Sequence, residues 1–90
     1  MGVKVYIAPY LQQYTGDVPV IETQGQRIGE CLDRVVEKFP DVRKALFDEE
    51  GKLLPHVAIF KNLSDVYPDD LAKPVSDGDE VYVAYVIAGG

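Results

Sequence analysis

Alternation of apolar and polar residues marks three segments of the chain as β-strands. Val3–Ala8, His56–Lys61 and Glu80–Val86 each contain valines or isoleucines two positions apart, and a period of two is typical of a strand with one buried face. Val18–Thr23 is rich in β-branched residues and indicates a fourth strand. Because Pro19 has no amide proton to donate to a neighbouring strand, we expect this strand at a sheet edge.

A period of three to four residues replaces the alternation in the middle of the chain. The segment from residue 28 to residue 39 is predicted to be an amphipathic helix ending before Pro40. Its apolar stripe is Ile28, Cys31, Leu32, Val35, Val36 and Phe39. A second helical turn over Val42–Phe47 and an acidic turn over Asp48–Gly51 should follow.

The remaining segments are expected to connect these elements. Residues 62–73 are polar and contain a proline, which predicts a loop, and Pro74–Val75 should add a short bridge. Asp77-Gly78-Asp79 has the composition of a tight turn directly before the last strand.

The order strand, strand, helix, strand, strand predicts an α+β domain. A mixed sheet with one main helix packed across one face, and with the last strand beside the first, is the β-grasp or ubiquitin-like fold. We expect a single domain over residues 1–90 with a flexible Gly-Gly tail at about residues 87–90. The same alternation places Tyr6, Phe60 and Tyr82 on the sheet face away from the helix, where they form a candidate partner-binding patch.

Charge narrows the set of partners. The 90 residues carry a net charge of −6, with a pI near 4.5, which opposes binding to nucleic acid or to an anionic membrane and favours a basic protein partner. The single cysteine cannot form an internal disulfide, and the N-terminus lacks a signal peptide, so we expect a cytoplasmic protein.

Side chains for catalysis or metal binding do not form a motif. Cys31 lies on the apolar helix stripe, His56 is the one histidine without a triad pattern around it, and GxxxxGK[ST], CxxC and HExxH are absent. The Asp77–Glu80 segment lacks the spacing of a calcium loop. We therefore expect no catalytic residue, no metal and no bound cofactor.

The C-terminal segment carries a specific signal. Asp77-Gly78-Asp79, one strand and the terminal pair Gly89-Gly90 follow one another, and this ending resembles the ThiS/MoaD family of ubiquitin-like sulfur carriers. The resemblance extends over nearly the whole chain through the helix ending at Pro40, the strand followed by Asn62, and the approach to the last strand. Ala84-Tyr85 stands where the family often has a proline, which leaves the partner pathway open.

The resemblance implies that the Gly90 carboxylate is adenylated by a ubiquitin-activating-type enzyme using ATP-Mg and is then converted to a thiocarboxylate. That group would donate sulfur in molybdopterin, thiamin or amino-acid biosynthesis to an acceptor such as a larger synthase subunit. Two glycines suit this role because a backbone without Cβ can approach a nucleotide closely. Ile87 and Ala88 would contact the partner beside Gly89 and Gly90.

Two other functions use the same fold. An activated Gly90 carboxylate also suits a protein modifier that forms an isopeptide bond with lysine, and the residues do not separate this from sulfur transfer. A β-grasp adaptor would bind through its sheet and make no use of its end.

Overall fold

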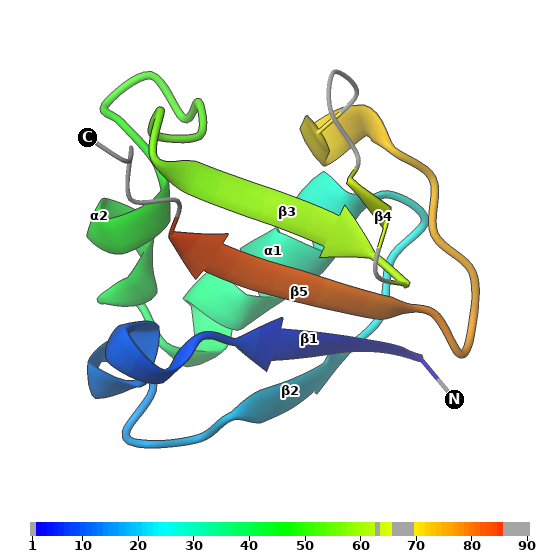
Figure 1. The fold of residues 1–90 in the computed structure, drawn as a ribbon, viewed down its shortest axis with the longest axis horizontal. Helices are drawn as coiled ribbons and strands as arrows, with labels where there is room; N and C mark the ends of the chain where they lie inside the picture. Colours follow the sequence, from blue (N-terminus) through cyan, green and yellow to red (C-terminus); the bar gives the residue numbers. More distant parts are fainter. Residues whose placement is uncertain (1, 63, 66–69, 86–90) are drawn as a thin grey trace.

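A five-stranded mixed sheet organises the molecule, which is described by a computed structural model for residues 2–62, 64–65 and 70–85. The strand order is β2-β1-β5-β3-β4, in which β5 is parallel to β1 and antiparallel to β3 (Figure 1). The first and last strands therefore lie side by side in the middle of the sheet. The strands are β1 (Val3–Ile7), β2 (Val20–Thr23), β3 (Val57–Lys61), β4 (Ser64–Asp65) and β5 (Glu80–Tyr85).

The main helix, α1 (Ile28–Lys38), packs across one face of this sheet (Figure 1). Its predicted apolar stripe is confirmed, since the side chains Ile28, Cys31, Leu32 and Val35 are buried. Glu30 in the first turn accepts a hydrogen bond from the Gln26 amide at 2.7 Å. The helix ends at Lys38 because the next residue, Phe39, precedes Pro40 and takes an extended φ of −133°.

The core fills the space between the helix and the sheet. The odd-numbered apolar residues of β1 and β5 face the helix and are at most 5% exposed; these are Val3, Val5, Ile7, Val81 and Val83. Burying an aliphatic side chain of this size is worth about 1.5–3 kcal/mol. The alternation of the sequence thus defines a buried face and, opposite it, an open face of the sheet.

Short elements depart from the expectations. The predicted loop over residues 62–73 is wrong in part, because it contains β4 and the 3₁₀ helix η2 (Asp70–Ala72). A further 3₁₀ helix, η1 (Pro9–Tyr14), follows β1, and β2 begins at Val20 rather than at residue 18.

The other predicted elements agree with the structure. The second helical turn is α2 (Val42–Leu46), Pro74 forms an isolated bridge with Arg27, and β2 lies at a sheet edge. In the acidic turn, Asp48 Oδ1 accepts the Glu50 amide at 2.8 Å. Residue 86, the predicted last residue of β5, lies outside the described residues.

Candidate functional site

An apolar row crosses the open face of the sheet. Val20 on β2 pairs in register with Tyr6 on β1, Tyr6 pairs with Tyr82 on β5, and Tyr82 pairs with Phe60 on β3. We call these four residues the open-face row. Val20 is 36% exposed and the three aromatic residues are half-buried. The structure therefore brings together all three aromatic residues predicted for the patch.

The two tyrosines of the row form a stacked pair. Their ring centroids are 4.5 Å apart and the ring planes differ by 11°, so the rings are stacked. Both hydroxyls donate to Glu80, Tyr6 to Oε2 at 3.0 Å and Tyr82 to Oε1 at 3.4 Å. The hydrogen bond to the Glu80 carboxylate raises the pKa of Tyr6. Desolvation, followed by the Glu80 charge, raises the pKa of Tyr82.

Small side chains continue the open face toward the end of β5. Ala84 on β5 pairs with Ala58 on β3, and both are half-buried. A partner surface can approach the backbone closely beside two alanines. The next residues are those of the predicted tail: Ile87, Ala88, Gly89 and Gly90 lie outside the described residues, so their roles stay predictions.

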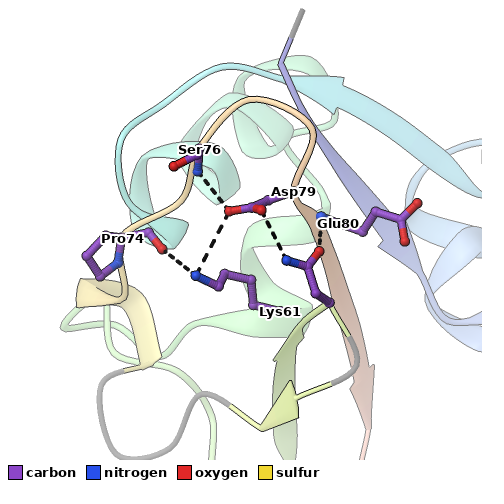
Figure 2. Close-up of polar contacts among 6 residues, drawn as sticks. Lys61, Pro74, Ser76, Asp79 and Glu80 are labelled. Atoms are coloured by element: carbon purple, nitrogen blue, oxygen red, sulfur yellow. Dashed lines mark hydrogen bonds and ion pairs between the residues drawn. The ribbon is translucent and has the colours of Figure 1, made fainter.

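A polar network holds the opposite end of β5, where the strand begins (Figure 2). The Asn62 side chain donates from Nδ2 to Asp79 Oδ1 at 3.0 Å and accepts the Glu80 amide on Oδ1 at 2.9 Å. The Asn62 amide also donates to the Glu80 carbonyl at 2.8 Å. Asn62 has a positive φ of 50°, a conformation that asparagine tolerates better than most residues.

Asp79 is the acceptor at the centre of this network. Its Oδ2 accepts the Ser76 amide at 2.8 Å and lies 3.9 Å from the Lys61 ammonium, which also donates to the Pro74 carbonyl (Figure 2). The hydrogen bond from Asn62 and then that from Ser76 lower the pKa of the Asp79 carboxyl. We call Lys61, Asn62, Ser76 and Asp79 the Asp79 clasp, because together they fix where β5 starts.

The turn before β5 also requires its glycine. Gly78 has a φ of 89°, which side chains rarely adopt, and its amide donates to the Gly2 carbonyl at 2.9 Å. The Asp77-Gly78-Asp79 sequence is thus a tight turn, as predicted, and it ties the last strand to the start of the first.

In the part of the chain that the structure describes, no reactive thiol and no metal-binding group of side chains lies on the open face. Cys31 is fully buried in α1, and burial raises the pKa of its thiol, which disfavours the reactive thiolate. In residues 2–62, 64–65 and 70–85, no three histidine, cysteine or acidic side chains are grouped to hold a metal ion. In the same residues no helix is long and apolar enough to cross a membrane.

Comparison with known proteins identifies the family. The model of the ThiS family matches residues 5–90. The chain belongs to the ThiS family. This confirms the resemblance seen in the sequence, and the family match extends through the Gly89-Gly90 pair. No curated protein sequence is significantly similar to the chain.

Solved structures share the fold of this ThiS family member. CysO in the Amycolatopsis orientalis BexX/CysO complex is 30% identical with a TM-score of 0.88, over 99% of this chain and 100% of that one. Mycobacterium tuberculosis CysO is 27% identical with a TM-score of 0.86, over 96% and 100%. SAMP1 from Haloferax volcanii is 22% identical with a TM-score of 0.79, over 98% of each chain. The predicted ubiquitin-like β-grasp fold is confirmed.

Two side chains of the site were missed from the sequence. Glu80 was noted only as the first residue of the last strand and as part of the Asp77–Glu80 segment, although its even position on that strand places it on the same face as Tyr82. Asn62 was noted only as the residue after a strand. Its contact with Asp79 joins residues 17 positions apart, and hydrophobic periodicity contains no signal for such a contact.

Proposed function

We propose that this ThiS family member is a sulfur carrier whose Gly90 carboxylate is activated by a separate enzyme. The observation that carries the proposal is the family match over residues 5–90, which includes the diglycine. The position of β5 supports it. This strand is hydrogen-bonded on both sides, by β1 and β3, so the tail follows directly from a central strand of the sheet.

The chemistry has two balanced steps. The Gly90 carboxylate attacks the α-phosphorus of ATP, an acyl-adenylate forms and pyrophosphate leaves. Hydrosulfide then attacks the carbonyl carbon, a C–S bond forms, the bond to AMP breaks, and one proton is released. The partner supplies the ATP-Mg site and the catalytic groups, and this chain supplies the carboxylate and the surface by which it is recognised.

The open-face row is proposed to be that recognition surface. One member of the row, Tyr82, lies on β5, the strand that leads to the tail. The aromatic residues of the row are of the type enriched at protein interfaces. BexX/CysO is a complex between a similar chain and another protein, which supports a protein partner here. We propose a ubiquitin-activating-type adenylating enzyme first and a sulfur acceptor, such as a larger synthase subunit, second.

The pathway and the compartment belong to the same proposal. We propose that the thiocarboxylate serves molybdopterin, thiamin or amino-acid biosynthesis and that the chain works in the cytoplasm. The lysine-modifier alternative uses the same acyl-adenylate. The SAMP1 structures, named for a small archaeal modifier protein, are 20–23% identical to this chain and share its fold, which does not favour one acceptor over the other.

The test is intact-mass spectrometry of the chain after incubation with its adenylating enzyme, ATP-Mg and sulfide. We expect a mass gain equal to exchange of one oxygen for sulfur, dependent on ATP and lost when Gly90 is deleted. A carrier of known activity in the same reaction is the positive control. An unchanged mass beside an active control would exclude the proposal, and lysine adducts without a thiocarboxylate would replace it with the modifier function.

A further inference from the structure

The carboxylate of Glu80 is held in a fixed orientation on the open face. Tyr6 donates to one oxygen and Tyr82 to the other, and the two rings are themselves held by stacking. A carboxylate has about four lone-pair positions for hydrogen bonds, so these two bonds leave acceptor capacity on both oxygens. Glu80 is itself half-buried.

The charges near Glu80 do not neutralise it. Lys4 is the residue paired with Glu80 on β1, and on its other side it is paired with Glu22 on β2. Lys4 and Glu22 are exposed. In residues 2–62, 64–65 and 70–85, Lys4 forms no ion pair with either glutamate, and this part of the face carries two carboxylates for one ammonium.

Docking on the open-face row would remove water from Glu80. The carboxylate is bonded to Tyr6 and Tyr82, which are members of the row, so a surface that covers the rings also covers the carboxylate. A charge buried without an opposite charge is strongly unfavourable in a complex. A cation presented by the partner at Glu80 would offset this cost, and the net charge of −6 on the chain favours the approach of such a partner.

Arginine fits this position better than lysine. A guanidinium is planar and donates from several N–H groups, so it can bond both carboxylate oxygens at once, whereas an ammonium acts as a point charge. We propose that Glu80, oriented by the Tyr6–Tyr82 pair, is the specificity-determining anchor of the open face and receives an arginine of the adenylating enzyme. The proposal rests on the proposed function for the identity of this partner.

The enzymatic test compares Glu80→Gln with Glu22→Gln, which removes the same charge from an exposed position on the same face. For Glu80→Gln we expect KM for the carrier to rise about tenfold or more with kcat unchanged, because a ground-state contact is lost. For Glu22→Gln we expect KM within about twofold of wild type, since exposed charges contribute little. Denaturation midpoints of both variants show that each is folded. Equal KM values for the two variants would overturn the proposal.

A second measurement is independent of any enzyme. The NMR probe is N-acetylarginine amide, and the matched control is N-acetylcitrulline amide, which has the same shape without the charge. We expect the arginine probe alone to shift the side-chain signals of Tyr6, Tyr82 and Glu80, and Glu80→Gln to abolish the shifts. Equal shifts with both probes would contradict the anchor. If the wild-type chain is never activated but the probe result holds, the sulfur-carrier function fails and the cation-binding anchor stands.

Discussion

The two faces of β5 use alternate residues for different purposes. Val81 and Val83 are 0% and 1% exposed and pack under α1, whereas Glu80, Tyr82 and Ala84 lie half-buried on the open face. Val81 and Val83 carry no polar side-chain group that needs a partner, whereas on the open face the Glu80 carboxylate is bonded to two phenols. One strand thus contributes both to the buried core and to the proposed recognition surface, and the residues on its two faces alternate from Glu80 to Ala84.

The largest expected effect on stability comes from a charge placed on the buried face of β5. Val81→Asp should lower the free energy of unfolding by about 4 kcal/mol or more, because it buries a charge with no partner. Tyr82→Lys, at the next residue, should leave the domain folded and weaken binding of the adenylating enzyme. Urea denaturation followed by a binding titration measures both. Similar loss of stability in the two variants would show that the faces are not separate.

The next largest effect on stability is expected from the Asp79 clasp. Asp79→Ala should lower the free energy of unfolding by about 1–3 kcal/mol, because the Asn62 and Ser76 donors lose their acceptor. Asp77→Ala is the matched control, since Asp77 is exposed in the same turn, and it should change stability by less than about 0.5 kcal/mol. Chemical denaturation of both variants measures the two changes in the free energy of unfolding. An equal effect at the two positions would remove the special role of Asp79.

The same clasp predicts a pH dependence. The pKa of Asp79 is lower in the folded chain than in the unfolded chain. The carboxylate therefore makes its full contribution to the free energy of unfolding above the unfolded pKa of about 3.9. This contribution is lost as the pH falls through the folded pKa. The difference in unfolding free energy between wild type and Asp79→Asn should therefore be constant near neutral pH and shrink in acid. Urea denaturation at a series of pH values measures this difference. A difference that grows in acid would contradict the predicted direction of the pH dependence.

The smallest effect lies on the open face. Glu80→Gln should lower the pKa of Tyr6 toward the ordinary value of about 10, because the carboxylate that stabilises the neutral phenol is removed. Absorbance titration of the phenolate in alkaline solution detects the change, and Tyr6→Phe assigns the signal. Because the wild-type pKa is raised, stability from this group is present below pH 10 and is lost as the pH rises through the folded value. An unchanged titration would show that Glu80 does not control Tyr6.

Long periodic segments were predictable from the sequence because burial imposes their pattern. The alternation in β1, β3 and β5 and the three-to-four spacing in α1 predicted these elements to within one or two residues, and it also placed Tyr6, Phe60 and Tyr82 on one face. Sheet register then made them neighbours, as the strand order required.

Short and polar elements were not predictable in the same way. The two residues of β4 and the three of η2 are too few to show a period. In η1, Leu11 is 3% exposed, but one buried residue beside Pro9 does not reveal a helix. The Asp79 clasp and the Glu80–tyrosine contacts depend on which strands become neighbours, so they follow only once the sheet is assembled.

The most direct test is tandem mass spectrometry of the C-terminal peptide of this chain recovered from the cells that produce it. The account predicts a fraction of the peptide ending in a Gly90 thiocarboxylate, present in wild type and absent when Gly90 is deleted. Gly90 found only as a free carboxylate under conditions of active sulfur metabolism, or only joined to lysine side chains, would contradict the sulfur-carrier account.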